Sequence, residues 1–295
     1  MKAFEISNLQ KNYPDFELGP LNLDLEPGTV LGYIGPNGSG KSTTLHCMVG
    51  LVKHESGDIK IFGRPNNPNK PAWKFDIGYV GDVHVFYENW SAAKNLKFLK
   101  QFYPAWSDKL VEDLVKRFEL PLDKKAKELS SGNRVKLSLV SALAHQPKLL
   151  LLDEPTAGLD PVVRTEVLDT LFEVLEDGER SIFYSTHILT DISRLADELA
   201  FLHDGKIMQR TAKEDLTENW RKISFRFEHT NGKINGVKSH QAEGKNHQVI
   251  SSDYKETLAH LAKLGVENII ENRLSIDEIA VEILKGAKDA TAPKS

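Results

Sequence analysis

The feature that most constrains this chain is a glycine-rich segment, Gly35-Pro36-Asn37-Gly38-Ser39-Gly40-Lys41-Ser42. It matches the pattern G-x-x-x-x-G-K-[ST], in which successive backbone N–H groups point at phosphate oxygens and larger side chains would obstruct the loop. The run from Thr29 to Ile34 predicts a buried strand before it, and a helical pattern begins at Lys41. The sequence therefore predicts a phosphate-binding loop between a strand and a helix N-terminus.

The residue types of this loop fit the chemistry of a bound nucleotide. Lys41 places a cation on the outer phosphates, and the Ser42 hydroxyl can ligate Mg²⁺. The N-terminus of the following helix adds positive potential. The predicted nucleotide-binding residues of this segment are Gly35, Pro36, Asn37, Gly38, Ser39, Gly40, Lys41, Ser42 and Thr43.

A second acidic element is the partner that such a loop requires. Leu149 to Leu152 is a bare aliphatic run, typical of a strand buried on both faces of a parallel sheet, and it ends in Asp153-Glu154. Ligands of open α/β sheets bind at the carboxyl ends of the strands. We therefore predict that Asp153 holds Mg²⁺ and that Glu154 polarises the water that attacks the γ-phosphate. Without the phosphate loop, the same run would indicate only a strand and a solvated turn.

The order of strands and helices predicts an α/β fold with a mostly parallel sheet, interrupted by a helical insert over residues 92–144. The composition changes after about residue 215, so we predict one domain over residues 1–217 and a small α+β appendage over 218–295. In that appendage we expect strands at Ile223–Phe227 and Gln248–Ile250 and amphipathic helices at Tyr254–Leu264 and Ile276–Leu284. A frayed tail is expected from about Gly286.

Composition excludes several functions. The net charge is −4, so the chain lacks the basic surface that nucleic acid selects, and we expect no nucleic-acid partner. The single cysteine, Cys47, allows no internal disulfide and is expected to fill the core. The segment Met1–Glu5 has no apolar stretch, so no signal peptide is expected. No aliphatic run approaches the roughly 20 residues that span a bilayer, so membrane work would fall to another chain.

Three further segments decide the class. Leu129-Ser130-Ser131-Gly132-Asn133 resembles the L-S-G-G-Q signature of ABC ATPases, with Ser131 and Asn133 departing from it. By itself this stretch is a helix cap. Ala157-Gly158-Leu159-Asp160 resembles the D-loop of that family, and Ser185-Thr186-His187 resembles its switch histidine segment. Tyr13 stands where the family has an aromatic residue that stacks on adenine.

Residues 3–215 therefore resemble the nucleotide-binding domains of ABC transporters, and the run Lys97–Trp106, which contains Phe102-Tyr103-Pro104-Ala105-Trp106, resembles the helical region of bacterial exporters of drugs or peptides. The resemblance implies a P-loop NTPase fold of the ABC ATPase type, with a mostly parallel core sheet, an antiparallel β subdomain and a helical subdomain. It implies ATP hydrolysis with Mg²⁺, with His187 orienting Glu154. It also implies that Ser130, Gly132 and Asn133 contact the γ-phosphate.

The resemblance also implies partners. Two such domains dimerise head to tail with ATP between the phosphate loop of one and the signature of the other, so a second, identical or related, subunit is expected. An integral membrane subunit is expected to place the protein in the cytoplasm, on the inner face of the membrane. The predicted docking groove is lined by apolar and aromatic residues: Val83, Val85, Phe86, Tyr87 and Trp90. Ordinary core packing is the alternative explanation of these residues.

One departure concerns the metal. Alignment through Ile77–Val80 places Asp82 where the family has a glutamine that touches Mg²⁺, and we hypothesise that Asp82 is a metal-shell residue.

Three alternative functions remain open. One is a soluble ABC ATPase of translation or DNA repair. A second is a GTPase or kinase, although no N-K-x-D motif is present. A third is a regulatory subunit that binds ATP and hydrolyses it weakly.

Overall fold

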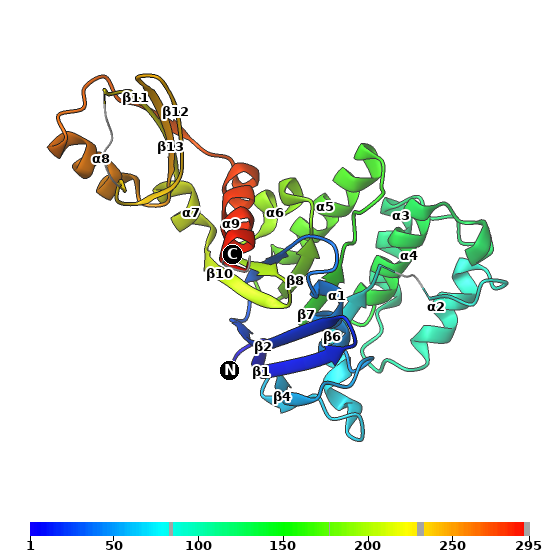
Figure 1. The fold of residues 1–295 in the computed structure, drawn as a ribbon. Coiled ribbons are helices and arrows are strands. Elements are labelled where there is room, and N and C mark those ends of the chain that lie inside the picture. Colours follow the sequence, from blue (N-terminus) through cyan, green and yellow to red (C-terminus); the bar gives the residue numbers. More distant parts are fainter. Residues whose placement is uncertain (83–84, 177, 229–232, 292–295) are drawn as a thin grey trace.

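The computed structural model describes residues 1–82, 85–176, 178–228 and 233–291, and they form three sheets with helices around them (Figure 1). The central sheet has the order β10-β9-β3-β8-β7-β6. Its strands are β3 (Val30–Ile34), β6 (Ile77–Val80), β7 (Leu149–Asp153), β8 (Ser181–Thr186), β9 (Glu198–His203) and β10 (Lys206–Ala212). All neighbours pair in parallel except β10, which runs antiparallel to β9. The predicted parallel core is confirmed.

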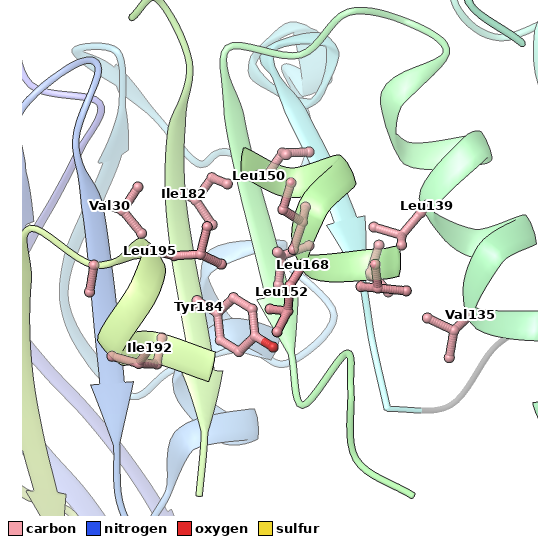
Figure 2. Packing of buried hydrophobic residues seen from close by; sticks show 14 of the residues in the cluster. Val30, Val135, Leu139, Leu150, Leu152, Leu168, Ile182, Tyr184, Ile192 and Leu195 are labelled. Atoms are coloured by element: carbon pink, nitrogen blue, oxygen red, sulfur yellow. The ribbon is translucent and has the colours of Figure 1, made fainter. Parts of the chain in front are cut away.

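Strands β3, β7 and β8 are buried along their whole length because both faces of the sheet are covered. Successive side chains of a strand point to opposite faces, so Leu150 and Leu152 enter one hydrophobic cluster while Leu149 and Leu151 enter the other. Each fully buried leucine contributes about 2 kcal/mol to folding by leaving water. Helices α4 (Ser131–Leu143), α5 (Pro161–Leu175) and α6 (Leu189–Leu195) cover the first face. Figure 2 shows this packing, with the labelled residues Val30, Leu139, Leu150, Leu168, Ile182 and Ile192.

The other face of the central sheet packs against helix α1 (Lys41–Met48) and against a second, antiparallel sheet. That sheet has the order β2-β1-β4-β5, formed by β1 (Phe4–Tyr13), β2 (Phe16–Leu25), β4 (Ser56–Ile61) and β5 (Arg64–Pro65). It is joined to the rest by a shared core in which Phe4 stands edge-on to Phe183 of β8, with ring centroids 5.2 Å apart. This is the predicted antiparallel subdomain.

The helical insert consists of α2 (Ala92–Lys100), α3 (Asp108–Arg117) and α4, with short 3₁₀ turns at Pro71–Asp76 and Ala126–Glu128 nearby. A serine caps each of the three helices: the side chains of Ser91, Ser107 and Ser130 each accept a hydrogen bond from the backbone N–H three residues later, at 3.2 Å. Such caps satisfy N–H groups that have no partner within the helix. The serines therefore fix where the helices of the insert begin.

The C-terminal part has its own sheet and small core. The sheet order is β12-β13-β11-β14, from β11 (Arg221–Arg226), β12 (Val237–Glu243), β13 (Asn246–Ser251) and β14 (Ile270–Arg273). Helix α8 (Tyr254–Lys263) packs on this sheet, and helix α7 (Lys213–Asn219) leads into it (Figure 1). Strands β11 and β13 and helix α8 match predicted elements. Strands β12 and β14 were not predicted, because their side chains are mostly exposed and polar.

The last helix, α9 (Ile276–Thr291), does not stay with the C-terminal sheet. It returns to the larger part of the chain, where Ile279 and Ala280 are fully buried with Leu195 of α6 and Leu199 of β9 (Figure 1). The boundary after residue 217 remains a prediction, but the two parts share this core. The frayed tail expected from about Gly286 also remains a prediction: helix α9 is described as far as Thr291, and residues 292–295 lie outside the described residues. In the described part of the chain, no helix has the length and apolarity that crossing a membrane requires.

The buried carboxylate of Asp191 connects α6 to α5, to β8 and to the loop after β7. Asp191 of α6 is fully buried and accepts a hydrogen bond from Arg164 Nε of α5 at 2.6 Å. Tyr184 of β8 donates to its other oxygen at 3.2 Å, and Thr156, from the loop after β7, donates to the same oxygen. The network therefore holds the loop after β7 against the start of α6.

Removing the cation of this network is expected to destabilise the fold. In an Arg164→Leu variant the Asp191 carboxylate keeps only neutral donors, so the free energy of unfolding should fall by about 3 kcal/mol, as measured by urea denaturation. Arg194→Leu is the control, because Arg194 pairs with Asp169 on the surface and such pairs contribute less than about 1 kcal/mol. Equal losses in the two variants would contradict this account.

Burial also sets the reactivity of Cys47. The side chain is fully buried in the core beside α1, and burial raises the pKa of its thiol to about 11. At pH 8 only about one thousandth of the Cys47 side chains are then in the reactive thiolate form, and burial also keeps reagents away from the sulfur. We expect no reaction of the native protein with a disulfide reagent at pH 8, and one thiol per chain after unfolding in guanidinium. Rapid labelling of the native protein would disprove the core assignment of Cys47.

Candidate active site

The glycine-rich segment is the tight turn between β3 and α1. A Cβ atom on Gly35 would lie 2.4 Å from the carbonyl oxygen of Leu202 in the adjacent strand. Gly40 has a φ of 107°, which side-chain-bearing residues rarely adopt, and a Cβ there would lie 2.6 Å from Leu18 and 2.8 Å from Phe16. Both glycines are therefore dictated by space and backbone angle. They let the loop pack between β2 and β9 while α1 begins at Lys41.

Lys41 is only 5 % exposed, and its amino group is held at the mouth of the loop. Nζ donates hydrogen bonds to the carbonyl oxygens of Gly35 at 2.8 Å and Pro36 at 3.2 Å. It also lies 3.1 Å from Oε1 of Glu154. That contact is an ion pair outside hydrogen-bond geometry, since Oε1 has no hydrogen-bond partner among the described residues. The loop and the end of β7 thus meet through Lys41 and Glu154, as the sequence predicts.

Asp153 closes β7 and is fully buried. The parallel register pairs it with Ser185 of β8, whose hydroxyl donates to Asp153 Oδ1 at 2.5 Å. Burial raises the pKa of the Asp153 carboxyl, hydrogen bonds from Ser185 and Ser42 oppose that shift, and the charge of Asp82 adds to it. Ser42 stands in the first turn of α1, so this turn lies near the end of β7.

Glu154 and His187 form the next contact along the same edge. Glu154 has a φ of 49°, and its N–H donates to the carbonyl of Ser185 at 3.0 Å. This turn directs the carboxylate toward His187, whose Nδ1 lies 2.8 Å from Glu154 Oε2 and whose backbone N–H donates to the same oxygen at 3.3 Å. The carboxylate is therefore held between Lys41 and His187, with one oxygen turned to each.

The predicted metal residues Ser42, Asp82 and Asp153 also come together. Strand β6 pairs in parallel with β7, so Asp82, just beyond the end of β6, reaches the same edge as Asp153. Asp82 is exposed and Asp153 buried, and their carboxylates have oxygen atoms within 4.8 Å of each other. Two carboxylates and a hydroxyl at this spacing are the oxygen ligands that Mg²⁺ prefers.

The residues present fit a magnesium nucleotide by a direct physical test. Buried polar atoms normally have hydrogen-bond partners. In the described residues, Ser39 Oγ, Asp153 Oδ2 and Glu154 Oε1 are buried without one, and all three lie in the phosphate loop or at the end of β7. Gly38 has a positive φ and open space where a Cβ would stand, so the loop backbone is accessible to a ligand. A phosphate group and a divalent cation would satisfy these atoms.

The remaining predicted contacts lie elsewhere in the chain. Ser130 caps α4, and Gly132 lies in the first turn of that helix. A Cβ atom on Gly132 would lie 3.2 Å from the side chain of Val163, which is a tight contact. Helix α4 lies with α2 and α3, on the helical side of the molecule in Figure 1. Tyr13 is 43 % exposed and pairs with Phe16, whose ring lies beside Gly40. Tyr13 is therefore close to the loop, whereas Ser130, Gly132 and Asn133 stand at the start of α4, in the helical insert.

Sequence reasoning did not identify Ser185 as a partner of Asp153, or Asp191 and Arg164 as supports of the neighbouring loops. Ser185 was read only as part of the segment before His187. The signal would have been the register of β7 and β8, because a polar residue opposite Asp153 in a buried sheet needs a polar partner. Sequence alone does not define that register.

An apolar groove opens beside β6, between the 3₁₀ turn at Pro71–Asp76, α2 and α4. It has a volume of about 470 Å³, and its lining includes Trp73, Val80, Val85, Phe86 and Tyr103. Of the residues predicted to line such a groove, Val85 and Phe86 do so, and Tyr87 lines an adjoining hollow with them. Trp90 stacks on Tyr87 with ring centroids 4.3 Å apart, and Val83 lies outside the described residues.

Comparison with known proteins agrees with this geometry. The family model described as ABC transporter matches residues 18–157. The ABC transporter ATP-binding protein YtrB of Bacillus subtilis (strain 168) is 33 % identical over 211 residues, which are 72 % of each chain. The bacitracin transport ATP-binding protein BcrA of Bacillus licheniformis is 29 % identical, over 88 % of this chain and 87 % of its own. A solved ATP-binding subunit of an ABC transporter superposes with a TM-score of 0.67 at 27 % identity, covering 73 % of this chain and 92 % of that chain.

The predicted family and fold class are therefore confirmed. The relative from Bacillus subtilis is identical at one third of the aligned positions, and the alignment covers 72 % of each chain. This chain belongs to the ABC transporter family, as one of its ATP-binding subunits.

Proposed function

We propose that this chain is the motor subunit of a bacterial exporter, which hydrolyses ATP at Lys41, Asp153, Glu154 and His187 to drive a separate membrane subunit. The observation that carries the proposal is the set of contacts at one sheet edge. Lys41 pairs with Glu154 at 3.1 Å, and His187 contacts the other oxygen of the same carboxylate at 2.8 Å. A cation and an orienting histidine thus contact the two oxygens of the general base beside the phosphate loop.

Each residue has a distinct role in this proposal. The triphosphate replaces Glu154 as the partner of Lys41, which frees the carboxylate to accept a proton from the attacking water. His187 holds the other carboxylate oxygen and keeps the base aligned during that transfer. Ser42, Asp82 and Asp153 would hold Mg²⁺. The ion, when bound, neutralises charge on the outer phosphates. Tyr13 stacks on the adenine.

The signature segment acts across a dimer in this proposal. Ser130, Gly132 and Asn133 are held at the N-terminus of α4, where backbone N–H groups and the helix dipole favour an anion. The phosphate loop lies on a different surface of the chain, so a second subunit, identical or related, would supply the signature to each ATP. The departures at Ser131 and Asn133 keep the serine cap and the unhindered glycine that such a contact needs.

Transport is the further part of the proposal. The similarity to a bacitracin transport protein along almost the whole chain supports a drug-like or peptide substrate, moved through an integral membrane subunit. The groove beside β6 is largely apolar and its lining includes Gly81, which precedes Asp82 in the chain, so a short helix of that subunit seated in it would lie one residue from a proposed metal ligand. The protein would then lie on the cytoplasmic face of the membrane. Residues 218–295 would form an accessory domain with α9 as its link to the ATPase core.

A weakly hydrolysing regulatory subunit is the second candidate, favoured by one observation. Asp82 adds negative charge beside Asp153 where the family has a neutral glutamine, and this opposes the approach of a triphosphate. The comparison of turnover between the native chain and the variant described next separates the two candidates.

Glu154→Gln tests the role of the base. An amide cannot accept the proton, so ATP turnover should fall at least about 100-fold while ATP binding persists and a dimer accumulates. Phosphate release, fluorescent-nucleotide binding and size-exclusion chromatography are the measurements. Glu214→Gln, on the exposed face of α7, is the matched control and should keep full turnover. Turnover in the native chain no faster than in Glu154→Gln would favour the regulatory candidate.

Lys41→Ala tests the phosphate contact. The variant loses the only cation that the loop holds within reach of the outer phosphates, so the affinity for ATP should fall by about 10-fold or more. Isothermal titration calorimetry with ATP gives the affinity directly. Unchanged affinity would exclude Lys41 from nucleotide binding.

Val85→Asp tests the groove. Val85 is 87 % exposed at the rim, so a charge there should leave the fold and ATP binding intact but block an apolar helix from docking. The measurement is co-purification with the proposed integral membrane subunit. Ile270→Asp, which places the same charge on an exposed residue of β14, is the control and should co-purify normally. Co-purification of both variants would remove the groove from the proposal.

A further inference from the structure

His46 has no role in the function proposed above, yet it faces the metal site. It lies on α1 one helical turn after Ser42, so the two side chains share a face of the helix. A ring nitrogen of His46 and one oxygen from each of Asp82 and Asp153 all lie within 4.8 Å of one another. Helix α1, the segment just after β6 and the end of β7 therefore each contribute one donor atom to this cluster.

The spacing suits a single divalent ion. Ligands on opposite sides of an octahedral ion with bonds of about 2.1 Å lie about 4.2 Å apart, and adjacent ligands about 3.0 Å apart. Three ligands of one ion include at most one opposite pair, so separations of up to 4.8 Å require the donor atoms to approach one another by up to about 1.8 Å. His46 is partly exposed and Asp82 is exposed, so neither side chain is locked in a packed core.

The donor atoms are also available. Asp153 is fully buried, and its Oδ2 has no hydrogen-bond partner among the described residues, which is costly unless a ligand satisfies it. Within the same described residues, no hydrogen bond engages the His46 ring, which stands edge-on to Tyr79 at a centroid distance of 6.4 Å. Asp82 likewise forms no ion pair there. Ser185 occupies Asp153 Oδ1, so Oδ2 is the oxygen of that carboxylate that is left for a ligand.

The donor set decides which ion fits best. Mg²⁺ prefers oxygen ligands only, whereas imidazole nitrogen favours first-row transition metals. We propose that His46 is a direct ligand of the cation at this site, and that the chain takes a divalent transition-metal ion such as Mn²⁺ in preference to Mg²⁺. The inference deepens the proposed function, because the same ion would accompany ATP. The three donors come from this chain alone, so the site also binds the metal without nucleotide.

The test uses the full chain without nucleotide and Mn²⁺ as the probe. Electron paramagnetic resonance gives the affinity for Mn²⁺, competition gives the affinity for Mg²⁺, and electron spin-echo modulation detects ¹⁴N bonded to the ion. We expect a ¹⁴N coupling of a directly bound imidazole in the native chain. In His46→Leu the coupling should vanish, and the preference for Mn²⁺ over Mg²⁺ should fall about 10-fold, because only the oxygen ligands remain.

Two matched variants keep the result interpretable. His54→Leu removes a histidine from the loop after α1 and should retain the coupling and the preference for Mn²⁺. Asp82→Asn should weaken both ions while the ¹⁴N coupling persists, and it serves as the second test if His46→Leu does not fold. A native chain without ¹⁴N coupling, or a coupling that survives in a folded His46→Leu, overturns the proposal.

The outcomes also separate this inference from the proposed function. A native chain that hydrolyses ATP with Mg²⁺ but shows no nitrogen coupling keeps its function and loses the imidazole ligand. A chain that shows the coupling with Mn²⁺ but does not bind ATP keeps the metal site and loses the function.

Discussion

The parallel register of the central sheet is the constraint on which the rest of this structure depends. Strands β6, β7, β8 and β3 run the same way, so their carboxyl ends, and the residues just beyond them, meet at one edge. Lys41 of the phosphate loop and Asp153 at the end of β7 are separated by more than a hundred residues in the chain. Register alone places Asp153 opposite Ser185 and brings the turn at Glu154 beside the loop that holds Lys41. The two hydrophobic clusters on either face are what keep that register fixed.

Negatively charged carboxylates are concentrated at this edge of the sheet, and burying them costs folding free energy. Asp82, Asp153 and Glu154 lie close together, with Lys41 as the buried cation that offsets them. Burial disfavours the ionised form of Asp153, and hydrogen bonds from Ser185 and Ser42 only partly compensate. A site of this kind stores unfavourable energy that a divalent cation relieves. Such sites are commonly functional, because a fold gains nothing from keeping buried charges without a ligand.

The C-terminal part is joined to this machinery by the packing of α9 as well as by the chain connection through α7. Helix α9 buries Ile279 and Ala280 against α6 and β9. Helix α6 follows directly after His187 and carries Asp191, whose network reaches the loop after Glu154. A displacement of α9 would therefore act on the element that positions the base and the switch histidine.

The sequence by itself determined the local features: the glycine-rich turn, the aliphatic strand ending in Asp153-Glu154, the serine caps and the helix periodicities. These depend on neighbouring residues, and the physics that produces them is local. It also predicted Ser42, Asp82 and His187 as site residues, because the order of motifs resembles a known family. Only the tertiary structure decided that Lys41 pairs with Glu154, that Ser185 supports Asp153, that His46 faces the metal site and that α9 returns to the core. These contacts depend on strand register and helix packing, which are set by the summed burial of two hydrophobic clusters and leave no signal in any short stretch of residues.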